Sequence, residues 1–484
     1  MDTEATRREE DLLGVLEIPI DAYWGIHAGR AICNFPISGR PVRPGLIRAF
    51  ALVKKACALA NLELGYLAPS KGEAIIAACG EIASGGLPDQ FPVDALQGGA
   101  GTSTNMNVNE VIANRAIELL HGRKGDYRLV HPLEEVNLHQ STNDVYPTAL
   151  KVASISGLRR LSQAAADLQG AFQEKEKAFG AIVKIGRTEM QEAVPMTLGA
   201  EFAAFSEAIA RDRWRTFKSE ERLRVVNLGG TAIGTGLTAP RDYIFLVIEK
   251  LREVSGMGLS RGENLTGETA NADPFVEVSG ILKAHATNLI KISGDLRLLN
   301  FMGEIHLSPV QAGSSIMPGK VNPVVLEAVI QTGLRVMADD MLIADAVSRG
   351  TWQINEFMPL IADAFLEEID LLTAADALLA GQVRRLVADE ARCRSFFDQS
   401  PMIVTALLPL IGYERATELI REFYLLESST DQSASSSEGH AGGKPNIRLF
   451  LEEKLGKKMI EEALSPYRLT ALGHREHGYH TQGE

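Results

Sequence analysis

One stretch of this sequence reads Gly313-Ser314-Ser315-Ile316-Met317-Pro318-Gly319-Lys320-Val321-Asn322-Pro323, and a long helical pattern precedes and follows it. Two hydroxyls, a lysine and an asparagine are bracketed here by glycine and proline. The stretch is therefore predicted to be a loop between helices over 271–299 and 324–346. Loops that present polar side chains from a rigid scaffold are typical functional sites, so we expect chemistry at this position.

Apolar stripes at helical spacing dominate the chain around this loop. One stripe consists of Leu158, Leu161, Ala165, Leu168, Phe172 and Phe179. Similar stripes run through 199–226, 275–300, 323–348 and 358–388. Successive helices of this length, with few strand signals, predict an antiparallel bundle whose apolar stripes form the core.

The length of 484 residues is enough for about three domains. We predict an N-terminal domain over 1–145 that mixes short helices with turns, a central long-helix bundle over 146–395, and a small C-terminal helical domain over 396–484. Within the last domain, 427–444 is rich in serine and glycine and has no apolar residue larger than alanine. This segment is predicted to be a flexible surface loop.

The net charge of −13 argues against nucleic acid or an anionic membrane as a partner. No apolar run is long enough to span a bilayer, and the charged segment 1–11 does not resemble a signal peptide. The four cysteines form no Cys-x-x-Cys pair, which favours neutral thiols in a reduced, cytoplasmic protein and argues against a zinc site. We expect the C-terminal histidines to be a solvated tail and not a metal site; they are His474, His477 and His480.

Two glycine-rich segments, 99–101 and 229–234, lack the strand–loop–helix context and the Gly-Lys-Ser/Thr sequence of a nucleotide site. We therefore predict no nucleotide cofactor. The second segment is expected to bring backbone close to an active site.

Several segments resemble the aspartase/fumarase superfamily, and within it the aspartases more than the fumarases. They are the loop at 313–323, Gln97 to Asn107, Gln140-Ser141-Thr142-Asn143-Asp144, Gly186-Arg187-Thr188 with Gln191 and Pro195, and two N-terminal segments at 9–14 and 22–27. The resemblance covers about 8–425. It implies a mainly α, three-domain fold whose long helices form a tetrameric core, with each active site shared between three subunits.

The resemblance also implies a cofactor-independent, metal-free carbon–nitrogen lyase that eliminates ammonia from L-aspartate to give fumarate. Such a reaction removes a proton from Cβ, and the carbanion spreads onto the neighbouring carboxylate as a dianionic aci-form that needs preorganised donors. By resemblance, Thr102, Ser141, Thr142 and Ser315 surround this β-carboxylate. Lys320, Asn322 and Thr188 bind the α-carboxylate, and Asn143 lies near the leaving amine.

Ser314 takes the role of general base by the same resemblance. A free serine is a poor base, so its alkoxide needs a donor-rich pocket and positive charge, which Lys320 and loop N–H groups would supply when the loop closes. A role as acyl nucleophile is disfavoured, because the sequence has neither Gly-x-Ser-x-Gly nor an evident histidine partner.

The sequence departs from the superfamily in two places. Glu189 stands where the family has histidine or glutamine facing the substrate, opposite a glutamate that corresponds to Glu327. Two carboxylates beside a dianionic substrate repel each other, so either one is protonated or a cation such as the aspartate ammonium lies between them. The other departure is a shortened segment at 300–304.

Three alternatives stay open at the level of sequence. The first alternative is a lyase with the same mechanism that acts on another 2-substituted succinate. This substrate would carry a substituted amine, or it would be nitrosuccinate. A fumarase is a second alternative. The third is an inactive scaffold or binding protein, against which the intact set of polar site residues argues.

Overall fold

A computed structural model describes residues 5–434 and 446–471, without the side chains of 429–434. The described part is mainly helical, as predicted. The helices are α1 (Ile26–Asn34), α2 (Pro44–Glu63), α3 (Pro69–Ala83), α4 (Thr102–Leu119), α5 (Thr142–Ala178), α6 (Leu198–Ser219), α7 (Arg241–Ser255), α8 (Leu265–Ala270), α9 (Asp273–Met302), α10 (Val324–Ser348), α11 (Met358–Arg385), α12 (Glu390–Gln399), α13 (Leu408–Ala434), α14 (Ile447–Leu455), α15 (Lys457–Ala463) and α16 (Pro466–Thr470). Short helical turns are η1 (Pro88–Gln90), η2 (Pro132–Val136), η3 (Glu220–Leu223) and η4 (Pro401–Leu407).

Four two-stranded sheets occur in the described ranges. They pair β1 (Thr6–Asp11) with β2 (Gly14–Pro19), β3 (Val183–Thr188) with β4 (Gln191–Thr197), β5 (Val225–Val226) with β6 (Ser260–Arg261), and β7 (Ile305–His306) with β8 (Val387–Ala388). The β1–β2 hairpin is an element that the sequence analysis did not predict. β1 carries no apolar residue at all, so its sequence lacks the alternation that marks a strand.

The long helices confirm the periodicity of the sequence. The stripe at 358–388 becomes α11, and the loop-flanking patterns become α9 and α10. The longest helix, α5, has 37 residues and continues through Pro147. Proline has no N–H for the carbonyl of Asn143 four residues earlier, and the Asn227 Nδ2 group donates to that carbonyl instead, at 2.9 Å.

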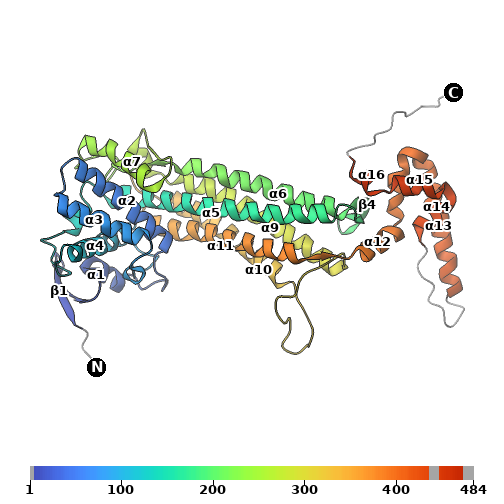
Figure 1. Ribbon diagram of the computed structural model, residues 1–484, viewed down its shortest axis with the longest axis horizontal. Helices are drawn as coiled ribbons and strands as arrows, with labels where there is room; N and C mark the ends of the chain where they lie inside the picture. The colour runs from blue at the N-terminus through green and yellow to red at the C-terminus, as the bar shows by residue number, and fades with distance from the viewer. Residues whose placement is uncertain (1–4, 435–445, 472–484) are drawn as a thin grey trace. The chain divides into compact units, whose positions relative to one another are not determined.

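The chain divides into two compact units, each assembled from three chain segments. Unit 1 comprises Met1–Ala164, Asp212–Thr287 and Gln331–Ala374, and unit 2 comprises Ala165–Arg211, Asn288–Ile330 and Ala375–Glu484. Segments of the long helices lie side by side within each unit (Figure 1). The three-domain division of the chain stays a prediction.

Unit 1 holds α2 packed against α3 and α7. Pro44 and Pro69 begin α2 and α3 at the first helical turn, where a missing N–H costs no helical hydrogen bond. The buried rings of Phe50 on α2 and Tyr146 on α5 meet edge to face at 5.4 Å. This contact fixes the start of α5 against α2.

The described part of unit 2 includes two apolar clusters. One is an aromatic cluster between α5 and α6, made by Phe172, Phe179, Phe202 and Phe205. The other lies among the C-terminal helices and includes Ile185 of β3, so the β3–β4 hairpin is held by the same core.

The serine- and glycine-rich segment differs from its prediction at its beginning. Residues 427–434 continue α13 as helix, because this part contains neither glycine nor proline to end it. The rest of that segment, 435–444, and the three histidines after 472 lie outside the described residues. No helix within the described ranges combines the length and apolar character that a bilayer crossing requires.

Candidate active site

The segment 313–323 forms a loop between β7 and α10 in unit 2. Two hydrogen bonds close its neck: Gly313 N–H donates to the Lys320 carbonyl at 2.7 Å, and Asn322 Nδ2 donates to the Gly313 carbonyl at 2.8 Å. A Cβ on Gly313 would lie only 2.7 Å from the Lys320 oxygen, so glycine is required there. The tip at 314–319 is therefore held as one closed turn.

Ser314 begins this tip and is half-buried. Its Oγ accepts hydrogen bonds from the backbone N–H groups of Ile316 at 3.2 Å and Met317 at 3.0 Å. Donors aimed at an oxygen favour its negatively charged form. This arrangement suits a serine that has to act as an alkoxide.

Ser315 and Lys320 are exposed on the same loop. Within the described part of the chain, the Lys320 ammonium forms no ion pair with a carboxylate, although the protein carries an excess of acidic residues. Its charge is thus available to an anionic ligand. Asn322 uses one amide hydrogen for the loop neck and keeps a second donor.

Thr188 and Glu189 lie at the tip of the β3–β4 hairpin, also in unit 2. Thr188 pairs with Gln191, so Glu189 and Met190 form a two-residue turn, with φ of 52° and 61°. Positive φ at both central positions is the pattern of a type I′ turn, which usually contains glycine or asparagine. Glu189 is exposed. No hydrogen bond or ion pair joins it to Glu327 among the residues that the structure describes.

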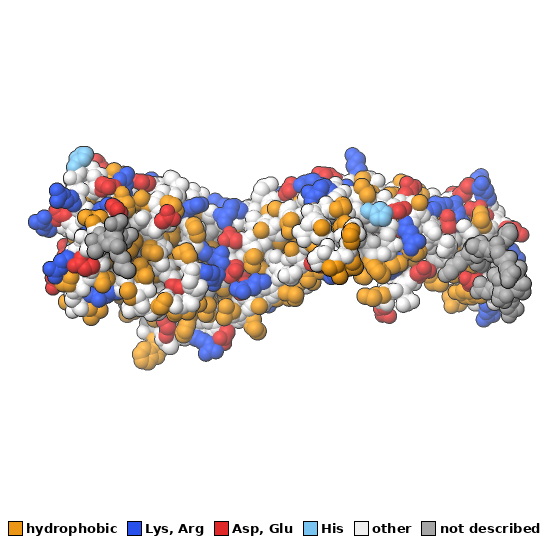
Figure 2. Space-filling view, turned by 90° about the horizontal axis from the view of Figure 1, so that it is seen from below, with side chains coloured by type: hydrophobic (Ala, Val, Ile, Leu, Met, Phe, Trp, Pro, Cys, Tyr) orange, Lys and Arg blue, Asp and Glu red, His pale blue; other side chains and the backbone are white. Residues whose placement is uncertain are grey.

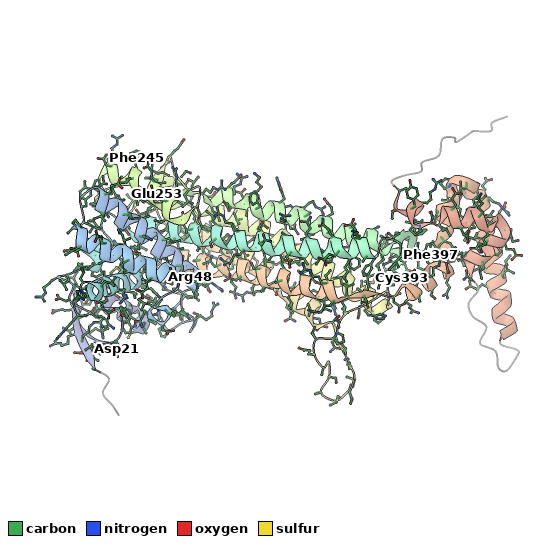
Figure 3. All side chains as sticks on the ribbon, in the orientation of Figure 1. Asp21, Arg48, Phe245, Glu253, Cys393 and Phe397 are labelled. Carbon is green, nitrogen blue, oxygen red and sulfur yellow. The ribbon has the colours of Figure 1, made fainter. Side chains whose placement is uncertain are left out.

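Glu304 follows the shortened segment and connects the hairpin to the end of α9. Its fully buried carboxylate lies 2.8 Å from Lys184 Nζ and accepts from Arg187 at 2.9 Å. The Lys184 ammonium forms an ion pair with Glu304 but is not aligned to donate a hydrogen bond to it. The Glu304 carbonyl lies 3.6 Å from the sulfur of Cys393 on α12, which Figure 3 labels. Glu304 thus fixes the strand that ends at Thr188.

In unit 1, the starts of α4 and α5 lie together. Gly101 precedes α4, and a Cβ at this residue would lie 2.2 Å from the ring of Tyr146 on α5, so the two helices approach closely here. Thr102 is the first residue of α4 and is exposed. Its hydroxyl donates to the Gly99 carbonyl at 2.8 Å, so it must exchange this bond before it donates to a ligand.

Ser141 caps α5 with a reciprocal pair of hydrogen bonds. Asn143 N–H donates to Ser141 Oγ at 3.3 Å, and Ser141 N–H donates to Asp144 Oδ1 at 2.9 Å. The other Asp144 oxygen accepts from the backbone of Gly229 and Thr231. Burial raises the pKa of Asp144 to about 6, against the effect of these backbone donors. The glycine-rich segment at 229–234 therefore lies at the start of α5. That it comes close to an active site stays a prediction.

Thr142 and Asn143 follow in the first turn of α5. Thr142 is buried, and its Oγ1 accepts from Asn105 Nδ2 of α4 at 3.1 Å. Asn143 Nδ2 donates to the Ala232 carbonyl at 2.7 Å, which leaves its Oδ1 as an acceptor. Two helix N-termini that converge with hydroxyl groups are suited to binding a carboxylate.

The predicted site residues thus fall into two sets. Thr102, Ser141, Thr142 and Asn143 lie in unit 1, and Thr188, Glu189, Ser314, Ser315, Lys320, Asn322 and Glu327 lie in unit 2. Sequence reasoning missed Asp144 and Glu304. The Ser-x-x-Asp pattern of a helix cap at 141–144 was a signal for the first, whereas nothing local marks the second.

Neither of the two large cavities in unit 2, of about 610 and 630 Å³, includes a predicted site residue in its lining. A small cavity of about 20 Å³ in unit 1 is lined by Thr142 and Asn143. No group of three or more metal-ligating side chains is arranged to hold an ion within 5–434 and 446–471.

Residues 14–338 match the family model described as lyase. The chain belongs to this lyase family. It is 46% identical over 476 residues to the aspartate ammonia-lyase of Pseudomonas canavaninivorans, covering 96% of this chain and 97% of that protein. The resemblance predicted from the motifs is therefore confirmed, and the protein is an enzyme, a carbon–nitrogen lyase.

Two solved structures of lyases are similar to this fold. A fumarate lyase:delta crystallin from Brucella melitensis, bound to cobalt, has a TM-score of 0.88 at 42% identity, covering 97% of this chain and all of that one. A class II fumarase from Schistosoma mansoni has a TM-score of 0.85 at 29% identity, covering 96% and 98%. The mainly α fold expected of this lyase family is confirmed.

Proposed function

We propose that this lyase releases ammonia from L-aspartate to give fumarate, without a cofactor, in the cytoplasm. The observation that carries the proposal is the near full-length similarity to an aspartate ammonia-lyase together with a polar site loop whose Lys320 charge is unpaired in the described part of the chain. A dicarboxylate needs such a cation.

In the proposed reaction, Ser314 as alkoxide removes a proton from Cβ of the substrate. The electrons of the broken C–H bond pass onto the β-carboxylate and form the aci-dianion. They then return to form the Cα–Cβ double bond as the Cα–N bond breaks, so the products are fumarate and ammonia. The two N–H groups at Ser314 Oγ support this role, because they stabilise the oxygen in its charged form.

The remaining residues would divide between the two carboxylates. Thr102, Ser141, Thr142 and Ser315 would donate to the β-carboxylate, where charge develops during the reaction. Lys320, Asn322 and Thr188 would hold the α-carboxylate. Asn143 would lie beside the amine. Its Nδ2 group donates to the Ala232 carbonyl, which leaves Oδ1 to accept a hydrogen bond from the ammonium.

The direct test is incubation with 2-substituted succinates while fumarate absorbance is followed. L-Aspartate should give fumarate and stoichiometric ammonia. Malate, substituted aspartates and nitrosuccinate serve as the other members of the panel. If a substituted aspartate or nitrosuccinate reacts and aspartate does not, carbon–nitrogen elimination stands and the leaving group assigned here is wrong. If malate alone reacts, the proposed function is overturned.

Glu189 is proposed to accept a hydrogen bond from the substrate ammonium. We expect Glu189→Gln to raise the KM for aspartate by about 10-fold, because the variant loses a charge-assisted hydrogen bond. Steady-state kinetics from neutral to alkaline pH would measure the change, with exposed Glu192→Gln as a control on the same hairpin. An unchanged KM would favour the alternative with another leaving group, in which Glu189 is a protonated donor that glutamine can replace.

A homotetramer is proposed, with active sites completed by three subunits. A single chain leaves Thr102, Glu189, Ser315 and Lys320 exposed, although such chemistry needs water to be excluded. Apolar side chains are also exposed on the face in Figure 2. Separately, the exposed apolar residues of α10 include Leu334, Met341 and Leu342 at helical spacing. This stripe is suited to packing against helices of another copy.

We therefore expect sedimentation to give a tetramer under assay conditions. Leu334→Glu with Met341→Glu should dissociate it and abolish activity, because charges cannot be buried between helices without partners. A stable, active monomer would rule out the shared site.

A further inference from the structure

Lys54 is a buried cation in unit 1 to which the proposed reaction gives no role. It lies on α2 with 0% exposure. Its Nζ donates to Asn137 Oδ1 and to Gln140 Oε1, each at 2.9 Å. A lysine this deeply buried needs a reason, since burial of an ammonium without a carboxylate in contact is costly.

The ammonium fixes the orientation of two asparagine amides. An ammonium only donates, so Asn137 must turn its oxygen, and not its nitrogen, toward Lys54. Asn105 also contacts this oxygen, at 3.3 Å, and therefore must present its Nδ2 group. The same Nδ2 carries a second hydrogen, which it donates to Thr142 Oγ1 at 3.1 Å.

The orientation matters at Thr142, where the chain of donors ends. Because Thr142 Oγ1 already accepts from Asn105, its own proton is left to donate elsewhere. No acceptor for this proton is found within the described ranges. Thr142 lines the small cavity of about 20 Å³ at the start of α5, so its proton is free for a ligand group that reaches this position.

We propose that Lys54 is a positioning residue: by fixing the amides of Asn137 and Asn105, it directs the Thr142 hydroxyl proton toward a carboxylate of the substrate. Without the ammonium, the Asn137 amide is held only by neutral contacts. Its Oδ1 accepts from Asn105 and Asn109, and its Nδ2 donates to the Gln140 carbonyl at 3.3 Å. These amides can then turn over together, and the Thr142 proton can be donated inward to Asn105 Oδ1. This role rests on the proposed binding of a dicarboxylate. It assigns a function in that binding to Lys54, which does not itself contact the ligand.

The positioning role of Lys54 predicts a pH dependence of ligand binding that a purely structural lysine would not show. Burial lowers the pKa of Lys54 to about 8. The titratable groups that face it are Asp144 on α5 and the thiols of Cys57 and Cys79 on α2 and α3. Burial raises the pKa of both thiols to about 12, and that of Asp144 to about 6. Between pH 7 and 9, Lys54 is therefore the member of this group that titrates, and its charge is lost as pH rises.

The test is a double-mutant cycle read by calorimetric titration with succinate, a dicarboxylate that cannot react. Lys54→Met should weaken succinate binding by about 10-fold in the native background and by less than about 2-fold in a Thr142→Val background. A purely structural lysine would give the same factor in both backgrounds. Equal factors would overturn the proposal.

A buried lysine in unit 2 supplies the matched control. Lys184→Met also removes a buried ammonium, but its effect on succinate binding should be additive with Thr142→Val. If Lys54→Met does not fold, as judged by circular dichroism, Asn105→Leu breaks the same chain of donors and should show the same coupling to Thr142. Additivity of Asn105→Leu with Thr142→Val would count against the proposal.

Conservative replacement tests the charge itself. In the native enzyme, succinate affinity should fall from pH 7 to 9, while succinate remains a dianion. Lys54→Arg keeps its charge throughout this range, so its affinity should not fall. The proposed function is tested separately. If the enzyme binds succinate with the expected coupling but releases no fumarate from aspartate, the role of Lys54 stands and the assigned substrate is wrong.

Discussion

Replacing Ser314 with alanine is expected to lower the rate of fumarate release by at least about 100-fold, the typical contribution of a positioned general base. The fold should tolerate the change, because the side chain lies on a loop and is only half-buried. The loss should fall on kcat, since the base acts mainly in the transition state. Succinate should bind the variant nearly as well as the native enzyme.

Lys320→Met supplies the contrast that makes this result specific. Removal of the loop cation should weaken succinate binding as well as turnover, because the charge faces a carboxylate in the ground state and in the transition state alike. Single-turnover measurements of fumarate formation, with succinate as competitor, separate the two effects. A Ser314→Ala enzyme that keeps more than about a tenth of the native rate, a loss under ~1.4 kcal/mol, would exclude Ser314 as the base.

Glu304→Gln is expected to lower the free energy of unfolding by about 3 kcal/mol, because it removes one member of a buried charge cluster. Lys184 is 2% exposed and would keep only Glu201 as an anionic partner, and Arg187 would lose its carboxylate. Urea denaturation followed by circular dichroism measures the change. Glu189→Gln, an exposed carboxylate in the same unit, should change it by less than about 0.5 kcal/mol.

The origin of the effect can be tested with a second replacement. If the cost comes from the unpaired ammonium, Lys184→Met combined with Glu304→Leu should recover most of the stability, because two apolar side chains replace two charges. A loss under about 1 kcal/mol for Glu304→Gln alone would show that water or Glu201 compensates the cluster.

Local patterns in the sequence predicted the long helices and the polar loop at 313–323, because both are encoded within a few turns of chain. The stripe in α11 and the Gly/Pro brackets around Ser314 needed no knowledge of distant residues. The type I′ turn at Glu189 was not predictable in this way, because neither central residue is the usual glycine or asparagine. The motif suggested a role for Glu189 but did not indicate its backbone conformation.

Contacts between residues far apart in the sequence account for what was missed. Lys54 looks like one more lysine on a helix until Asn137 and Gln140, more than 80 positions away, are seen to accept from it. Glu304 joins Lys184 across an even longer stretch of chain. Whether such a charge is buried depends on how whole helices and strands pack together. Hydrophobic periodicity within one element carries no information about this packing.

The hairpin tip has a consequence for how this enzyme can change. Two side chains in succession occupy the left-handed region at Glu189 and Met190, at a cost of roughly 1 kcal/mol each relative to glycine. Selection for heat resistance alone would therefore favour glycine or asparagine at both positions. If the carboxylate of Glu189 recognises an ammonium, selection for turnover opposes the first of these replacements and leaves the second free. A library screened for thermal stability should accumulate changes at position 190, and lose activity with each one at 189.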